Sequence, residues 1–411
     1  MGTPIYSSFK PLEVIEHPLL AKGLLIEDGG GRSVLCAVDW CELCNETYDV
    51  FRARMAEAAG TIPARVAVQT VHQHTAPMAD AEAIRILAAS PNPPPYPAAS
   101  TVEDALTRLV TAVKEATGRM QLFDRFGHGQ ARVERVASNR RVPIGAGKVG
   151  FRASSCRDPE FIAKPEGLID PFVKTITFAR GGAAIARVHY YATHPQSFYG
   201  DPRASYDFVG MARERLQEEE RVFQIYFTGC AGDIAAGKYN DASPEARQGL
   251  FERLHAGMAA SAAATEYRPA SDMLWRSTSL RLASRDDAGF VSADLQSAMQ
   301  NTAAAHSVRL GAAMALAWRS RVERPIELTA FQLGNVWAVH LPGEPMIDFQ
   351  FYAQQQQPDA CVAVAGYGDC GPAYICLDKA FGEGGYEPGA AHVPAGSEAV
   401  FRAAIRALMA T

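Results

Sequence analysis

Apolar residues gather in short runs along the chain, and three pairs of these runs are joined by tight polar turns. Such pairs predict β-hairpins, because Gly and Asn in the turn allow the chain to reverse. The predicted hairpins join Gly23–Glu27 to Ser33–Asp39, Val173–Phe178 to Ala184–Tyr191, and Ile326–Leu333 to Val336–Leu341.

Other apolar runs stand alone or recur with a helical period. Short isolated runs predict buried strands at Val66–Val71, Val222–Phe227 and Cys361–Gly366. Helices are predicted at Tyr48–Ala59, from Asp207 onward with Phe208, Ala212 and Leu216 on one face and Asp207 as the N-cap, at Ser243–Ala264, at Ala293–Arg321, and at Ser397–Met409.

Hairpins interspersed with helices indicate an α/β fold of mixed β-sheets with flanking helices, a layered sandwich. No shift of composition marks a boundary along the 411 residues, so we expect a single catalytic domain over 1–411. The Pro-rich stretch Ser90–Ser100 cannot continue a helix or a central strand, and we expect a surface loop that could form a rim or lid.

Composition narrows the class of protein. With 48% hydrophobic and 21% charged residues the chain is globular. A net charge of -5 without a Lys/Arg block argues against nucleic acid as a partner. Apolar runs such as Leu310–Trp318 are too short to span a membrane, so we expect no transmembrane segment. The opening residues lack the pattern of a secretory signal, which predicts a cytoplasmic protein.

The eight cysteines are few for this length, and we interpret them as free thiols. Cys41 and Cys44 form one CxxC without a second pair at zinc-finger spacing. Buried packing is therefore favoured over a redox or metal role for this pair.

The segment VHQHTAP carries the strongest local chemical signal. His72 and His74 are two residues apart, and on an extended chain such residues point to the same side. One imidazole could then bind a metal while the other acts as acid or base. So short a motif fits equally well two surface histidines in a loop.

Two further side chains occupy the same kind of place. His194 and Glu344 each follow a predicted strand and stand beside Pro or Gly in THPQS and LPGEP. Two histidines and one carboxylate are the ligand set of a catalytic zinc site, so His72, His194 and Glu344 predict such a centre. Alone, Glu344 would be an ordinary solvated carboxylate.

A series of motifs in one order resembles the neutral/alkaline ceramidase superfamily and covers nearly the whole chain. The matching pieces are His72 to Pro77, Asn139 to Arg141, His194 to Ser197, Ser205 to Gly210, Gly229 to Asp233, Pro342 to Glu344, and Tyr374 with Tyr386 and Glu387.

The resemblance implies a Zn²⁺ ion held by His72, His194, Glu344 and Tyr374, and a metal-activated water that cleaves an amide bond. It also implies that His74 is the acid/base group and that Arg140 and Tyr386 meet the substrate carbonyl. From chemistry alone, Tyr374 would be a buried core tyrosine. Arg141 is interpreted as a solvated or salt-bridged side chain. Asp233 could orient a zinc-bound imidazole or only form a turn.

The chain also departs from that family. We expect a shorter protein without the family's C-terminal immunoglobulin-like domain. In addition, Ala235 replaces a serine, and HQHTAPMAD lacks the glycines that flank the family's pocket. We therefore expect a small-molecule N-acyl substrate, with ceramide as only one lipid of that class. An ester or sugar-derived substrate, or a catalytically silent binding protein, remains the alternative. The other seven histidines, His17, His128, His189, His255, His306, His340 and His392, are interpreted as structural.

Overall fold

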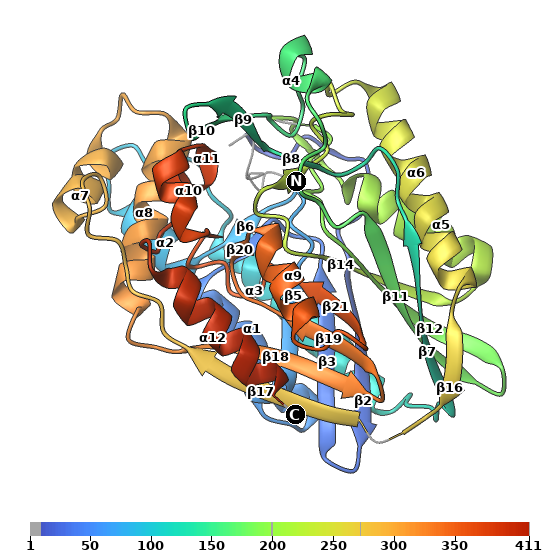
Figure 1. Ribbon diagram of the computed structural model, residues 1–411. Coiled ribbons are helices and arrows are strands. Elements are labelled where there is room, and N and C mark those ends of the chain that lie inside the picture. Colours follow the sequence, from blue (N-terminus) through green and yellow to red (C-terminus); the bar gives the residue numbers. More distant parts are fainter. Residues whose placement is uncertain (1–9, 199, 272, 411) are drawn as a thin grey trace.

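The first sheet contains the N-terminal hairpin and the strand that leads to the VHQHTAP segment. The computed structural model describes residues 10–198, 200–271 and 273–410 (Figure 1). The order of this sheet is β2-β3-β5, with β3 antiparallel to β2 and parallel to β5. The strands are β2 Ala21–Asp28, β3 Gly31–Val38 and β5 Val66–Thr70. The expectation of a cytoplasmic protein rested partly on residues 1–9, and these lie outside the described residues.

The second sheet has five strands and contains the second predicted hairpin. Its order is β14-β12-β11-β7-β16, and only the β12–β14 pair is parallel. The strands are β7 Arg125–Arg132, β11 Phe172–Arg180, β12 Ala183–Tyr191, β14 Phe223–Thr228 and β16 Glu266–Pro269. Helices α5 (Asp207–Glu220) and α6 (Pro244–Ala263) lie side by side over this sheet (Figure 1).

The third sheet has the order β17-β18-β19-β21 and contains the third predicted hairpin. Its strands are β17 Met273–Leu280, β18 Ile326–Leu333, β19 Val336–His340 and β21 Cys361–Ala365. Helix α12 (Ser397–Met409) lies across β17 and β18, and α9 (Ile347–Gln355) packs on β21 (Figure 1).

Short strand pairs connect the loops between the sheets. They are β1 Val14–Ile15 with β13 Arg203–Ala204, β4 Glu42–Leu43 with β6 Met78–Ala79, β8 Ser138–Asn139 with β15 Ile234–Ala235, β9 Arg141–Gly145 with β10 Lys148–Phe151, and β20 Glu344–Pro345 with β22 Tyr374–Ile375. The remaining helices are α1 Asn45–Ala59, η1 Pro63–Arg65, α2 Ala81–Ala88, α3 Ala99–Thr117, α4 Pro159–Ala163, α7 Ser292–Gln300, α8 His306–Arg321, α10 Asp378–Glu383 and α11 Tyr386–Ala390.

The three sheets meet at the centre of the molecule and the helices cover them. β14 contacts β2, β3 and β5, and β12 contacts β21. On the helix led by Asp207, the face formed by Phe208, Ala212 and Leu216 is buried as predicted. Mixed sheets with flanking helices confirm the predicted fold class, although the single-domain assignment stays a prediction.

Two predicted segments differ in detail. Ala293–Arg321 is not one helix, because α7 ends at Gln300 and α8 begins at His306. The Pro-rich loop ends at Ala98, the residue before α3, and part of it is buried. Arg309 of α8 donates hydrogen bonds to the carbonyls of Asn92 and Met299, at 2.7 and 2.8 Å, and so connects this loop to both helices. The sequence predicted one helix because alanine favours helix on both sides of the break, and this preference does not show where one helix ends and the next begins.

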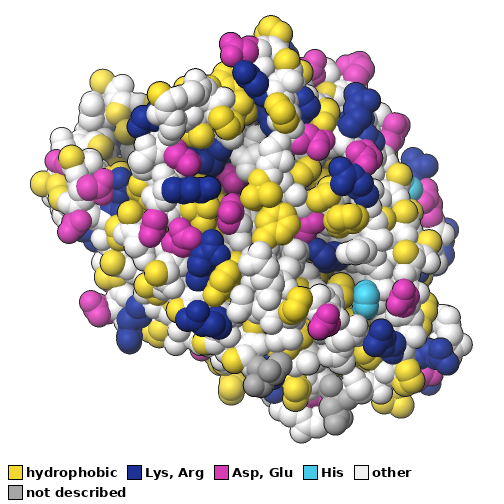
Figure 2. All heavy atoms as spheres, in the orientation of Figure 1, with side chains coloured by type: hydrophobic (Ala, Val, Ile, Leu, Met, Phe, Trp, Pro, Cys, Tyr) yellow, Lys and Arg dark blue, Asp and Glu magenta, His cyan; other side chains and the backbone are white. Residues whose placement is uncertain are grey.

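The helices, the surface charges and the cysteines match what we expected from the composition. None of the helices in the described part of the chain combines the length and apolar character needed to cross a bilayer. Positive and negative side chains are interspersed over the face shown in Figure 2. All eight cysteines are free thiols, and Cys41 and Cys44 are fully buried.

Candidate metal centre

The carboxyl ends of strands from all three sheets meet at one place. His72 follows β5, His194 follows β12, and Glu344 follows β19. The strand ends are joined directly, since Thr228 Oγ1 donates to the carbonyl of Val71 at 2.7 Å and Gly366 N donates to Thr228 O at 3.0 Å. The three predicted ligands therefore belong to one rigid junction of the sheets.

The His72 imidazole is oriented by the backbone. Its Nδ1 lies 2.8 Å from the carbonyl oxygen of Cys41, which can only accept, so Nδ1 carries the hydrogen. Its Nε2 is then an electron-pair donor and lies 3.1 Å from Oε2 of Glu344. The ring of Tyr367 stacks on this imidazole with centroids 4.3 Å apart.

His194 is oriented in the same way by the loop TGCAGD. Its Nδ1 lies 2.7 Å from the carbonyl of Ala231 and 3.1 Å from that of Ile234. Its Nε2 lies 3.2 Å from Oε2 of Glu344. The predicted alternative that Asp233 orients an imidazole is not what this loop does, because the Asp233 carboxylate accepts from Ile347 N and Asn139 Nδ2.

Three electron-pair donors therefore face one another at this junction. Nε2 of His72, Nε2 of His194 and Oε2 of Glu344 are buried, make no hydrogen bond, and all lie within 4.8 Å of one another. Lone pairs so close together in a buried place repel unless a cation lies among them. This donor set fits a zinc ion.

The electrostatics of Glu344 and His194 support the same conclusion. The pKa of His72 shifts the other way, because burial works to lower it but Glu344 outweighs burial and raises it. Burial works to raise the pKa of Glu344, but His72 and His194 outweigh it and hold that pKa well below its usual range. Burial, followed by the charge of Arg140, lowers the pKa of His194 to about 4. An ionised carboxylate and a neutral imidazole are the forms that bind metal.

His74 lies beside His72, but not for the reason expected from an extended chain. Its ring centroid is 4.9 Å from that of His72 and 5.8 Å from that of His194. His72 has φ +71°, so the backbone turns between the two histidines instead of extending. The closeness of the two histidines was predicted correctly, but the extended backbone that we expected to cause it was wrong.

Tyr374, Arg140 and Tyr386 lie together on one side of the centre. Tyr374 pairs with Glu344 across β20 and β22, and its hydroxyl accepts from Nη2 of Arg140 at 3.2 Å. The Arg140 guanidinium lies 5.6 Å from the ring of Tyr386. Glu387 is the buried counter-charge, with Oε1 3.3 Å from Nε of Arg140. The structure thus brings together every predicted site residue of this group.

Arg141 is salt-bridged, as we preferred from the sequence. Its Nη1 and Nη2 lie 2.8 Å and 3.0 Å from carboxylate oxygens of Glu387 and Glu383.

Burial works to lower the pKa of Arg140, but Tyr374 and Glu387 outweigh it, so that pKa is raised and Arg140 stays charged.

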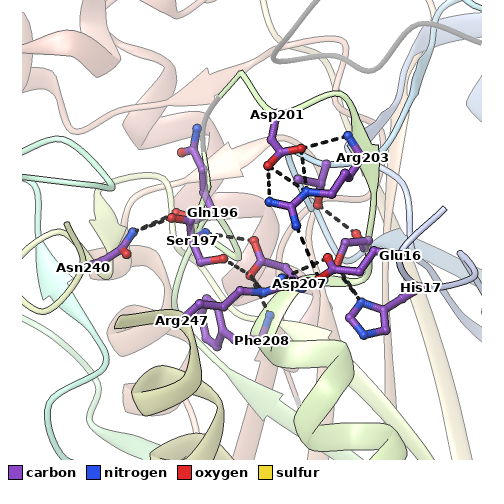
Figure 3. Close-up of polar contacts among 12 residues, drawn as sticks. Glu16, His17, Gln196, Ser197, Asp201, Arg203, Asp207, Phe208, Asn240 and Arg247 are labelled. Atoms are coloured by element: carbon purple, nitrogen blue, oxygen red, sulfur yellow. Dashed lines mark hydrogen bonds and ion pairs between the residues drawn. The ribbon is translucent and has the colours of Figure 1, made fainter. Parts of the chain in front are cut away.

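A polar network holds the loop that follows His194 (Figure 3). The Asp207 carboxylate accepts from Ser197 N at 2.9 Å and also from Ser197 Oγ, while Asn240 Nδ2 donates to Ser197 O at 3.0 Å. Asp207 is the first residue of α5 and Tyr206 precedes it as the N-cap, so the predicted N-cap role was wrong. Asp207 instead fixes the His194 loop.

The same network reaches the His74 loop. Ser205 and Thr75 are joined by two hydrogen bonds, Ser205 N to Thr75 O at 3.1 Å and Thr75 Oγ1 to Ser205 O at 2.8 Å. Arg247 donates to Ser205 Oγ at 2.7 Å and to the Glu16 carboxylate at 2.9 Å (Figure 3). The N-terminal segment and both histidine loops are therefore connected through polar groups.

A cavity of about 650 Å³ opens onto the centre. His72, His74, Arg140, Glu344, Tyr374 and Tyr386 all line it. Its apolar wall comes from α7 and α8, with Leu295, Leu310 and Met314. No residue of Ser90–Ser100 is among the lining residues, so the Pro-rich loop supports α8 from behind instead of covering the cavity.

Sequence reasoning missed several residues of this cavity. Glu42 lies in it, where burial and then Glu344 raise the pKa of the Glu42 carboxyl to about 7. His392, which we expected to be structural only, also lines it. Outside the lining, Tyr367 stacks on the proposed ligand His72, and Glu387, already part of the sequence motif, pairs with Arg140. The sequence offered one signal for Tyr367, which is its position just after a predicted strand. It offered no signal for Glu42.

A second group of possible ligands, Cys41, His72 and His74, shares His72 with the first. The Nδ1 of His72 is already committed to the carbonyl of Cys41. Burial raises the pKa of the Cys41 thiol well above its usual value, so the sulfur keeps its proton. The His72, His194 and Glu344 group is therefore the better metal site.

Comparison with known proteins gives a match at the level of the fold. No family model and no curated protein matches the chain. The crystal structure of neutral ceramidase from Pseudomonas aeruginosa matches with a TM-score of 0.68 and 15% identity, over 99% of this chain and 71% of that one. A ceramidase complexed with C2 matches with a TM-score of 0.64 and 13% identity, over 99% and 72%. The predicted ceramidase-like fold is confirmed.

Proposed function

We propose that this chain, which has the fold of neutral ceramidase, is a zinc-dependent hydrolase that cleaves an amide bond in a small N-acyl substrate. The observation that carries the proposal is the set of three buried electron-pair donors on His72, His194 and Glu344. The ceramidase fold supports an amide, because both structures that match this fold are ceramidases.

The proposed ligands are His72, His194, Glu344 and Tyr374. When bound there, zinc would supply a Lewis acid and lower the pKa of a water molecule towards about 7. Tyr374 lies opposite Glu344 on the neighbouring strand, which supports its place in the set. Burial, followed by Glu344, raises the pKa of the Tyr374 phenol well above its usual value, and Arg140 at its hydroxyl opposes that rise.

The other residues of the cavity can perform the remaining tasks of amide hydrolysis. Arg140 stays charged and Tyr386 lies beside it, so both can stabilise the negative charge that develops on the substrate carbonyl. Burial, followed by His72 and His194, lowers the pKa of His74 well below its usual value, so this imidazole is neutral. A neutral imidazole can take the proton of the attacking water and pass it to the leaving nitrogen.

The apolar wall formed by α7 and α8 supports a substrate with an apolar portion. Leu295, Leu310 and Met314 face the cavity that also contains the proposed ligands. Burial of such a portion would contribute roughly 25 cal/mol per Å² of apolar surface. An acyl group is therefore a suitable occupant.

Elemental analysis and hydrolysis assays test the proposal. Purified protein reconstituted with zinc should bind about one ion per chain and hydrolyse at least one member of a panel of N-acyl substrates. His72→Ala and Glu344→Gln should lose both properties. His255→Ala, which changes a histidine bonded to Glu219 away from the cavity, should keep them.

Either of two results would reject the proposal. The first is a reconstituted protein without bound metal. The second is metal binding with ligand-induced stabilisation but no turnover, which would favour the catalytically silent binding protein. Turnover of O-acyl but not N-acyl substrates would favour the ester alternative.

A further inference from the structure

Glu42 is a buried acidic side chain of the cavity that the proposed reaction does not use. It begins strand β4 and its exposed fraction is 4%. It lines the same cavity as His72, His74 and Glu344. A buried carboxylate that faces a ligand cavity is a candidate for contact with the substrate.

The backbone fixes Glu42 relative to the proposed metal ligands. The preceding residue, Cys41, accepts the hydrogen bond from His72 through its carbonyl oxygen. The following residue, Leu43, forms a bridge with Asp369, and β4 pairs in parallel with β6, where Glu42 lies opposite Met78. These contacts fix the backbone of Glu42, and its side chain lines the cavity from that position.

Glu42 also has weaker partners than the other acidic groups near it. Glu387 is paired with two arginines, and Glu344 faces two histidines. Glu42 accepts a hydrogen bond from the thiol of Cys44 at 3.6 Å, and within the described residues no ion pair includes it. A thiol is a weak donor, so a substrate that offers a stronger donor would gain free energy here.

The charges of the cavity favour a neutral donor. Arg140 is balanced by Glu387, and Glu344 faces His72 and His194, so these charged groups already have their own partners. A cationic group on the substrate would disturb this balance, whereas an N–H group would not. An N–H group is also the feature that separates a secondary amide from an ester of the same skeleton.

We propose that Glu42 accepts a hydrogen bond from the N–H of the scissile amide and so makes the site selective for secondary amides over esters. This inference rests on the proposed function and specifies its substrate class. An ester presents an oxygen lone pair at the same position, which the carboxylate repels. Glu42 is thus a specificity-determining residue that touches the substrate without forming a bond to it.

Matched substrates and variants test the inference. The substrates share one acyl group and one carbon skeleton and differ only in the linkage: secondary amide, N-methylated tertiary amide, or ester. Glu42→Gln should lower kcat/KM for the secondary amide roughly 10- to 100-fold, the range expected when a charge-assisted hydrogen bond is lost. Its kcat/KM for the ester should stay the same or rise, because the carboxamide can donate to the ester oxygen.

The controls separate this inference from the proposed function. Glu46→Gln changes an exposed carboxylate four residues away and should leave all three rates unchanged. Glu42→Gln should keep the zinc content of the wild-type protein. A variant that slows amide and ester by the same factor, or a wild-type preference for the tertiary amide, would overturn the role of Glu42.

Binding provides a readout that does not depend on turnover. If the wild-type protein hydrolyses none of the three compounds, the proposed function fails, and calorimetric affinities for the same compounds then test Glu42. The wild-type protein should bind the secondary amide more tightly than the ester, and Glu42→Gln should remove the difference. Equal wild-type affinities would overturn the inference.

Discussion

Backbone carbonyl groups fix the direction of both central imidazoles. His72 donates from Nδ1 to Cys41, and His194 donates from Nδ1 to Ala231. Each remaining nitrogen is thereby held towards Glu344 as an electron-pair donor. Carbonyls keep this role at every pH because they do not titrate, which suits a centre that must present neutral imidazoles.

Asp207 is the residue through which the His194 loop is most directly held. Its φ is +52°, an uncommon conformation that asparagine also tolerates. Asp207→Asn should keep the backbone and weaken the bonds to Ser197, which lowers zinc affinity about tenfold. Chelator competition measures that affinity, with Asp241→Asn, an exposed residue, as the control. Unchanged affinity alongside lowered stability would make Asp207 merely structural.

His189 predicts an acid-dependent loss of stability. Burial lowers its pKa to about 4 from the ordinary value of 6.5. Between these pH values the unfolded chain binds a proton that the folded protein does not. The contribution of neutral His189 is therefore complete above pH 6.5 and declines towards pH 4, by about 3 kcal/mol in total.

Urea unfolding at successive pH values checks this expectation. His189→Gln can still hydrogen-bond with Thr175 or Gln224, and it should show a shallower fall of unfolding free energy between pH 6.5 and 4. The exposed His306→Gln serves as the control. Parallel curves for His189→Gln and the wild type would contradict the assignment.

At the scale of elements, the cavity is positioned by connections between segments that are far apart in the sequence. The ends of β5, β12 and β19 supply the proposed ligands, and the β20–β22 pair brings Tyr374 beside Glu344. Helices α7 and α8 supply the apolar wall. Helices and strands were predictable here because their apolar periodicity is local.

Arg309 is the main connection behind that wall. It is 2% exposed and donates to carbonyls in the Pro-rich loop and at the end of α7. Arg309→Met leaves these buried acceptors without donors and should lower the unfolding free energy by about 3 kcal/mol. It should also raise KM for substrates with apolar groups. Urea unfolding and steady-state kinetics measure both effects.

The matched control for this change is Arg108→Met, which alters an exposed arginine on α3. Its unfolding free energy should stay within about 0.5 kcal/mol of the wild type. If Arg309→Met is destabilised but KM is unchanged, the Pro-rich loop does not shape the substrate wall.

At the scale of the whole molecule, the proposed metal centre lies where three sheets meet. A ligand that binds only the folded state stabilises it by about 2.7 kcal/mol at a free concentration one hundred times its Kd. Because the ligands follow strands of all three sheets, this stabilisation should appear as one increase in Tm for the entire chain.

Thermal unfolding at increasing free zinc measures that increase. Chelation should lower Tm, and added zinc should restore it in a concentration-dependent manner. His72→Ala should show no zinc-dependent change, whereas His255→Ala should behave as the wild type. An equal increase in His72→Ala would place the stabilising zinc elsewhere in the molecule.

The sequence by itself determined the hairpins, the helices α1, α5, α6 and α12, and the mixed-sheet fold class, because each depends on neighbouring residues. It also placed His72, His194 and Glu344 after strands, since a strand end is a local feature. The connection of those ends, the burial of Glu42 and the wall formed by α7 and α8 depend on residues up to hundreds of positions apart.

Only the tertiary structure decided which of these side chains share one cavity. The turn at His72, the pairing of Tyr374 with Glu344 and the bonds from Asp207 to the His194 loop have no local pattern. They arise when the three sheets pack together. The physical reason is that packing fixes distances between distant segments, whereas a sequence pattern reports only which face of each segment is buried.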